Sequence, residues 1–169
     1  MQKPPLVAVD TNFPLQLAKG NDDALDALAL IRARIKPAKI LVPPTALAEL
    51  LFQSENETDF QQREFASVAL SRLCAEWRIQ PGILGALDES RVLAAARRLL
   101  LKGALPRQEW NDAKIIAEAA VLDSALLVSN DSHLLQMDPR WLVVVFREFD
   151  LPVPLIASPR DLLHKFYRR

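Results

Sequence analysis

Short apolar runs recur along the chain, and longer segments of helical period separate them. Four runs are expected to be buried strands, because each holds a few apolar residues next to polar, Pro or Gly positions. They occupy residues 6–10, 39–44, 78–82 and 125–131. Near the C-terminus, "WLVVVFREF" at 141–149 and "VPLIAS" at 153–158 are also expected to be strands.

The segments between these runs place apolar residues three and four positions apart, which is the spacing of one helix face. The predicted helices are 22–35, 45–53, 60–77, 88–103, 108–122 and 158–166. Thr45 is expected to cap the second of these helices. Ser158, followed by Pro159 and Asp161, marks the start of the last one.

Strands that alternate with helices predict an α/β fold, a mostly parallel sheet with helices on both faces. The length of 169 residues suits one domain spanning residues 1–169. Half of the residues are apolar, so the chain can bury a core without cross-links. Residues 53–107 are expected to form a helical arm region within that domain.

Charge and cysteine content restrict the partners and the location. The 21 basic and 21 acidic residues give a net charge of zero, which disfavours a broad basic surface but permits a local basic groove. Cys74 is the only cysteine, and it is predicted to lie in the core with Leu73 and Trp77. A reducing, cytoplasmic location is therefore expected. No signal peptide is expected, because no long apolar stretch precedes Asp10, and no apolar run approaches the ~20 residues of a membrane helix.

Two carboxylates follow predicted strands directly. Asp10 ends the first strand, and Asp131 follows the run "LLVS" late in the chain. Sites in open parallel sheets form at the carboxyl ends of the strands, so these acids would meet if their strands are neighbours. The alternative is that both are turn or N-cap residues, because Asp favours such positions.

Two further acids lie on predicted helices. Asp112 shares the apolar stripe of Ile115, Ile116 and Ala119, where an unpaired acid is costly. The alternative is that Asp112 complements the helix dipole. This explains why Asp112 lies near the N-terminus of the predicted helix, but not why it lies on the apolar face. Glu49 lies in the first turns after "ILVPP", near the same sheet edge as Asp10, although it could equally belong to a solvated stripe.

Four converging carboxylates predict a bound cation. Several of them could not ionise together in a partly dry cleft without one, and hard oxygen ligands suit Mg²⁺ or Mn²⁺. Neither histidine is expected to join the cluster, since His164 lies in the terminal helix and His133 is expected at the surface. A zinc site is therefore not expected.

Four segments together resemble the PIN-domain nuclease family. They are "VAVDTN", "LVPPTALAELL", "NDAKIIAEAA" and "LLVSNDSHLL", in the order and approximate spacing of that family. The resemblance spans the chain from Val7 to about Phe166. It implies a three-layer α/β/α fold with strand order 3-2-1-4-5, and it identifies the chain as similar to stand-alone, toxin-like ribonucleases.

The resemblance also implies a role for each matching residue. The metal-binding acids would be Asp10, Glu49, Asp112 and Asp131. Three residues would support them: Asn12 by a side-chain hydrogen bond to the first Asp, Ser129 as the small hydroxyl residue before the last Asp, and Thr11 in the turn. The implied cofactor is one or two ions of Mg²⁺ or Mn²⁺.

The chain departs from the family pattern at three places. Pro14 follows the "DTN" motif closely and is expected to delay the first helix. The region from Gln53 to Arg107 is longer than in small toxin members, and an extra strand-like piece follows Met137. These differences concern the subfamily more than the site.

The implied reaction is metal-dependent hydrolysis of phosphodiester bonds in single-stranded RNA. A candidate nucleic-acid-binding cluster lies beside the third acid in sequence: Arg97, Arg98, Lys102 and Arg107. A second basic cluster spans residues 32–39. The alternative for both is a solvated helix face. Trp110 would stack on a base or, alternatively, pack in the core.

Other functions remain open at this level. A haloacid dehalogenase-type phosphatase would use Asp10 as a nucleophile, but Asn12 occupies the place of its second Asp. A non-catalytic, metal-binding interaction module is a third possibility. Apolar arms between Phe60 and Leu101 would form a homodimer or hold a small antitoxin, as in the toxin of a toxin–antitoxin pair.

Overall fold

Five parallel strands form the centre of the molecule. The computed structural model describes residues 4–167, and its strands are β1 Leu6–Val9, β2 Lys39–Val42, β3 Ile79–Pro81, β4 Ser124–Val128 and β5 Leu155–Ala157. Their order in the sheet is β3-β2-β1-β4-β5, with every neighbouring pair parallel. The predicted α/β fold and strand order 3-2-1-4-5 are therefore confirmed.

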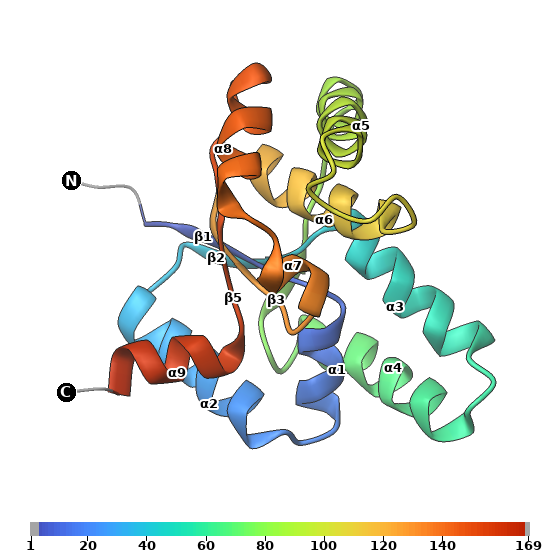
Figure 1. Ribbon diagram of the computed structural model, residues 1–169. Coiled ribbons are helices and arrows are strands. Elements are labelled where there is room, and N and C mark those ends of the chain that lie inside the picture. The colour runs from blue at the N-terminus through green and yellow to red at the C-terminus, as the bar shows by residue number, and fades with distance from the viewer. Residues whose placement is uncertain (1–3, 168–169) are drawn as a thin grey trace.

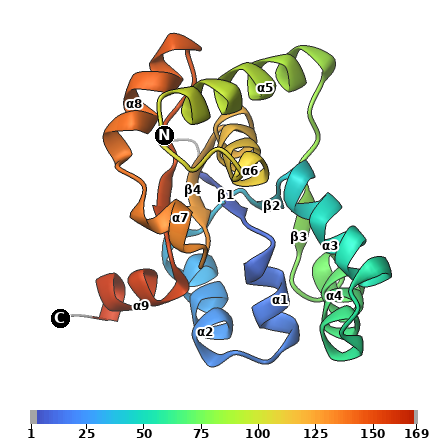
Figure 2. The same cartoon turned by 45° about the vertical axis from the view of Figure 1, so that its right-hand side comes forward.

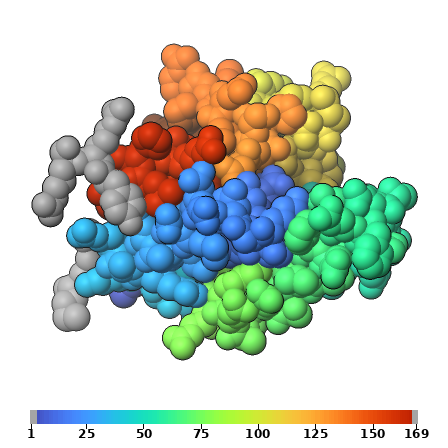
Figure 3. All heavy atoms as spheres, turned by 90° about the horizontal axis from the view of Figure 1, so that it is seen from below, coloured from blue at the N-terminus to red at the C-terminus, as the bar shows by residue number. Residues whose placement is uncertain are grey.

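Helices cover both faces of this sheet. They are α1 Asn12–Ala18, α2 Asp22–Leu30 with its π-helical continuation η1 Ile31–Ile35, α3 Pro44–Asn56, α4 Phe60–Leu73, α5 Ala86–Leu101, α6 Trp110–Val121, α7 Ser132–Gln136, α8 Pro139–Glu148 and α9 Pro159–Tyr167. Helices α5, α6 and α8 lie on one side of the sheet, and α1, α2, α4 and α9 lie on the other (Figures 1 and 2). Seen from below, α1 lies between α2 and the end formed by α3 and α4 (Figure 3).

The central strand explains why the first apolar run lacks alternation. Val7, Ala8 and Val9 have no exposed surface, because β1 has a strand on each side and helices above and below. A strand buried on both faces needs apolar residues at successive positions. The "LVAV" run therefore fixes the end of β1, and with it Asp10, inside a rigid part of the molecule.

The predicted strand at 141–149 is wrong, because this segment lies in α8. Asp138 caps the helix, its Oδ1 accepting from the Arg140 N–H at 2.9 Å, and Pro139 occupies the first turn. Leu142, Val145 and Phe146 then face the core at helical spacing. Strand propensity of the valines is overridden by this start signal and by packing on one face. The other C-terminal run does form a strand, β5.

Two predicted helix starts also differ from the structure. Helix α1 begins at Asn12, so Pro14 does not delay it; a proline is tolerated there because N–H groups of the first turn have no helical partner. Helix α3 begins at Pro44, and Thr45 is not its cap. In contrast, Ser158 and Asp161 exchange side-chain-to-backbone hydrogen bonds, as predicted for the start of α9.

Cys74 was predicted to lie in the core, and this is wrong because its side chain is exposed. Helix α4 ends at Leu73, so the helical stripe does not continue through Cys74 to Trp77. Residues 53–107 contribute the end of α3, α4, β3 and α5, and β3 pairs with β2 inside the sheet.

None of the helices within residues 4–167 combines the length and apolar character needed to cross a membrane.

Candidate active site

Asp10 and Asp131 meet at the carboxyl edge of the sheet because their strands are neighbours. Val9 pairs with Val128 across β1 and β4, and the Asp10 N–H donates to the Val128 carbonyl at 2.9 Å. Asp131 also caps α7, its Oδ1 accepting from the N–H groups of His133 and Leu134. The N-cap alternative thus describes Asp131 correctly, and the same position brings it next to the other acids.

Ser129 connects the two acids. Its Oγ donates to Asp10 Oδ2 at 2.6 Å and accepts from the Asp131 N–H at 3.0 Å. The Thr11 N–H donates to Asp10 Oδ1. The hydrogen bond expected from Asn12 is absent from the bonds that the described residues make to Asp10, so this part of the prediction is wrong. The local backbone N–H and a hydroxyl that follows the neighbouring strand orient Asp10 instead.

Glu49 belongs to the same group rather than to a solvated stripe. Its Oε2 accepts from the Thr11 hydroxyl, and its Oε1 accepts from Asn111 Nδ2 at 2.8 Å. Thr11 follows β1 and Asn111 lies in the first turn of α6, so Glu49 is held from two elements. Sequence reasoning missed Asn111, although it directly precedes Asp112 and an amide beside a predicted ligand was a usable signal.

Asp112 faces the other acids from the first turn of α6. Its Oδ2 is buried and, among residues 4–167, has no hydrogen-bond partner. Burial, with the negative charges of Asp131 and Asp10 and the adjacent Glu109 carboxyl, raises the pKa of Asp112 to about 8. Burial also raises the pKa of Asp10 to about 6, against the lowering effect of hydrogen bonds from Ser129 and Thr11, while the charges of Glu49 and Asp131 add to the rise.

A divalent cation fits this arrangement. The four predicted acids, from the end of β1, α3, α6 and the β4–α7 connection, gather at one edge of the sheet. The orphaned Oδ2 of Asp112 is an oxygen ligand without a competing bond, and a cation would offset the repulsion that raises the two pKa values. Carboxylate oxygens suit Mg²⁺ or Mn²⁺.

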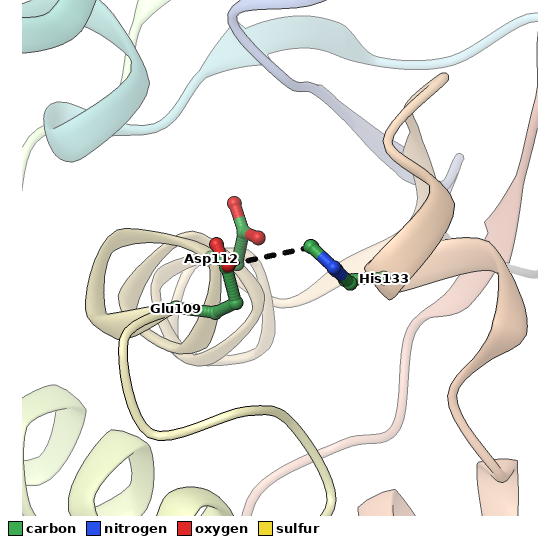
Figure 4. Close-up of side chains that lie close together, drawn as sticks. All are labelled: Glu109, Asp112 and His133. Carbon is green, nitrogen blue, oxygen red and sulfur yellow. Dashed lines mark ion pairs between the residues drawn. The ribbon is translucent and has the colours of Figure 1, made fainter.

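His133 lies closer to the acids than expected. Its Nδ1 is 3.5 Å from Glu109 Oε1 and 3.7 Å from Asp131 Oδ1. Glu109, Asp112 and His133 each offer one ligand atom, and these atoms lie within 4.8 Å of one another; Figure 4 shows the Glu109–His133 pair next to Asp112. The prediction that His133 is exposed is confirmed, and the expectation that no histidine binds the metal stays a prediction.

Glu118 is a buried acid that sequence reasoning missed. Its side chain is only 4% exposed, and it accepts from the Thr45 N–H at 2.9 Å and from the Thr45 hydroxyl at 2.6 Å. Burial raises the pKa of Glu118, and both bonds from Thr45 oppose this rise. Since Thr45 lies in the first turn of α3 and Glu118 on α6, this contact joins the helices that carry Glu49 and Asp112. The signal in the sequence was a single acid inside "IIAEAAV".

One member of the predicted nucleic-acid-binding cluster is bonded to an acid within the protein. The Arg98 guanidinium makes two hydrogen bonds to the Glu148 carboxylate, at 2.8 and 3.2 Å, and so connects α5 to α8. Arg97 and Arg107 are exposed, and Lys102 is half-buried. Trp110 packs against the hydrophobic core, which was the alternative to base stacking for this residue.

Comparisons with known proteins agree with this fold. A family profile described as PIN domain matches residues 7–138. No curated protein matches this chain. Among solved structures, the chain is similar to one from Rickettsia felis titled "Crystal structure of VapBC2 from Rickettsia felis bound to a DNA fragment from their promoter". The TM-score is 0.60 and the identity 18%, over 90% of this chain and 98% of that one; at this identity the likeness shows the fold alone.

Proposed function

This chain belongs to the PIN-domain family, and we propose that it is a metal-dependent endoribonuclease that hydrolyses phosphodiester bonds of single-stranded RNA. The observation that carries the proposal is the buried, unpartnered Oδ2 of Asp112, which faces the charges of Asp10 and Asp131. Such a carboxylate is unfavourable for folding and is useful when it binds a cation. With the family assigned, the haloacid dehalogenase alternative has no support.

The chain's own residues would bind and orient the reacting groups. We propose that Asp10, Glu49, Asp112 and Asp131 hold one or two Mg²⁺ or Mn²⁺ ions. A bound ion of this kind lowers the pKa of a water molecule and neutralises charge near a phosphate. Ser129 and Thr11 fix the carboxylates of Asp10 and Glu49 by hydrogen bonds. The pKa of Asp112, raised by burial and neighbouring charges in the metal-free protein, means that this carboxyl group would release its proton when a cation binds.

We also propose that residues 1–169 form one PIN-like domain and that the protein is cytoplasmic. A chain with one cysteine forms no internal disulfide, which agrees with a reducing compartment. The similar Rickettsia felis structure is of VapBC2 bound to promoter DNA, and we propose that our chain acts as the toxin of a toxin–antitoxin pair. The antitoxin would be a small protein that covers an apolar surface of the nuclease.

The reaction is tested with purified protein and labelled oligonucleotides. We expect internal cleavage of mixed-sequence single-stranded RNA with Mg²⁺ or Mn²⁺, and no cleavage in excess EDTA, because the acids cannot bind a phosphate without a cation. Single-stranded DNA and double-stranded RNA of the same sequence serve as comparison substrates, read by denaturing gel. Cleavage that survives EDTA would contradict the mechanism, and a preference for DNA would contradict the substrate class.

Exposed apolar residues on and beside α5 suggest where a second subunit binds. Leu87 is 83% exposed, and Ile83 and Leu101 are also exposed, so this face is unsuited to water. We expect a homodimer in light scattering and a monomer after Leu87→Glu, with RNA cleavage retained. Leu25→Glu, at an exposed position of α2, is the control and should remain dimeric. A monomeric wild-type protein would contradict the homodimer.

A further inference from the structure

A cavity of about 680 Å³ opens directly beside the acidic group. Helix α3 forms one wall, and the first turns of α6 form the other, where these helices lie side by side (Figures 1 and 2). Glu49 lines the cavity and is also bonded to Asn111 on the opposite wall at 2.8 Å. A molecule in this cavity would therefore contact the same carboxylate that belongs to the candidate metal site.

Phe52 provides an exposed aromatic surface in this cavity. It lies three residues after Glu49 on α3, so the two side chains share one helix face, and both line the cavity. Its side chain is 66% exposed, which leaves most of the apolar ring in water. A ring held on a helix near a phosphate-cleaving site is a suitable platform for a nucleic-acid base, because every base has a face that stacks.

The opposite wall carries groups that complement a nucleotide. Lys114 lines the cavity one turn after Asn111. Its charge helps to hold down the pKa of the buried Glu118 carboxyl, but Lys114 forms no close ion pair with a carboxylate of residues 4–167, and its ammonium would also attract a phosphate. Gln53 adds a carboxamide on the α3 side, with donors and acceptors for a base edge. The one further acid in the lining, Glu57, already accepts from the Thr58 N–H at 2.9 Å.

We propose that this cavity is a nucleotide subsite for the RNA substrate, adjacent to the phosphate that is cleaved. Phe52 stacks on a base, Lys114 contacts a backbone phosphate and Gln53 faces the base edge. The identity of the substrate rests on the proposed function. The combination of a cation without a close ion pair, an exposed ring and continuity with the acids favours single-stranded nucleic acid over a protein partner.

The test compares two exposed phenylalanines. Phe52→Ala is expected to raise the KM for single-stranded RNA in Mn²⁺ about 5- to 150-fold, the range for losing one stacked base, while Phe52→Trp stays close to wild type. Phe60→Ala is the matched control, since Phe60 is 68% exposed at the start of α4 and does not line the cavity. Affinity measured by fluorescence anisotropy, with labelled RNA and variants made in an Asp112→Asn background, should show the same order without cleavage.

The possible outcomes distinguish failure of the nucleotide subsite from failure of the proposed function. If wild type cleaves RNA and Phe52→Ala behaves like Phe60→Ala, the subsite is wrong and the proposed function stands. If wild type neither binds nor cleaves RNA, both proposals fail. If Phe52→Ala leaves RNA affinity unchanged but converts a dimer to a monomer in light scattering, the surface is a protein interface and the subsite is overturned.

Discussion

Replacing Asp112 with Asn is expected to lower metal-dependent RNA cleavage by at least about 100-fold and, at the same time, to stabilise the metal-free protein. The loss of activity follows because the carboxamide would keep the size of the side chain but lose the charge that attracts a cation. The gain in stability follows because Asp112 Oδ2 is buried without a partner among residues 4–167 and its charge is opposed by Asp131 and Asp10. Cleavage is measured in Mn²⁺, and stability by urea unfolding in EDTA.

The stabilisation should depend on pH in a defined direction. The pKa of Asp112 is raised from 3.8 to about 8 in the folded protein, so the unfolded chain releases this proton first as pH rises. Wild-type stability therefore falls between about pH 4 and pH 8, and this contribution is constant at higher pH. We expect the Asp112→Asn variant to gain about 1–2 kcal/mol at pH 8.5, a value reduced for solvent screening of a half-buried group, and much less at pH 5.

The control is Asp26→Asn, which removes an exposed acid from α2 and should change neither property. Adding Mn²⁺ should stabilise wild type and leave the Asp112→Asn variant much less affected, by ligand linkage. Equal RNA cleavage by wild type and the Asp112→Asn variant would contradict the metal site. A variant that is less stable than wild type at pH 8.5 would show that the buried oxygen is satisfied in solution.

Replacing Glu118 with Ala is expected to lower the free energy of unfolding by about 2–4 kcal/mol. The change leaves the N–H and hydroxyl of Thr45 without their buried acceptor and opens space between α3 and α6. Since these helices carry Glu49 and Asp112, we also expect Mn²⁺ affinity to fall about 10- to 100-fold, the usual effect of losing a group that supports a metal ligand. Urea unfolding and Mn²⁺ titration calorimetry measure the two effects.

Glu118→Gln separates support of the site from support of the fold. It retains one acceptor oxygen for Thr45, so its stability should lie between those of wild type and the Ala variant, and its Mn²⁺ affinity should recover in the same proportion. Glu64→Ala, at an exposed position on α4, is the control. If Glu118→Ala unfolds as easily as expected yet binds Mn²⁺ like wild type, Glu118 stabilises the helix pair without positioning the ligands.

The site acids are the part of the chemistry that the sequence anticipated best. Asp10 and Asp131 follow apolar runs, and Asp112 lies on an apolar stripe, so local pattern alone raised the idea of a shared edge. The structure brings these residues and Glu49 together. Their role in binding a metal is part of the proposed function, and the variants above test it.

The supporting contacts could not be predicted in the same way. Glu118 finds Thr45 at a separation of 73 residues, and Ser129 reaches Asp10 across a separation of 119. Both depend on which elements are neighbours, and a hydroxyl or amide gives no periodic signal of its own. For the same reason Asn12 was assigned the role that Ser129 and Thr11 fulfil.

Local pattern determined the strands β1 to β5, most helices and the positions of the acids at element ends, because buried strands and amphipathic helices repeat apolar residues at fixed spacing. Where a second signal competed, pattern was insufficient: the valines of α8 suggested a strand, but the Asp138 cap and one-sided packing made a helix. Tertiary structure alone decided which hydrogen bonds each acid receives and that, within residues 4–167, Asp112 Oδ2 receives none. The physical reason is that burial and pairing of a polar atom depend on neighbours in space, which lie far apart in the chain.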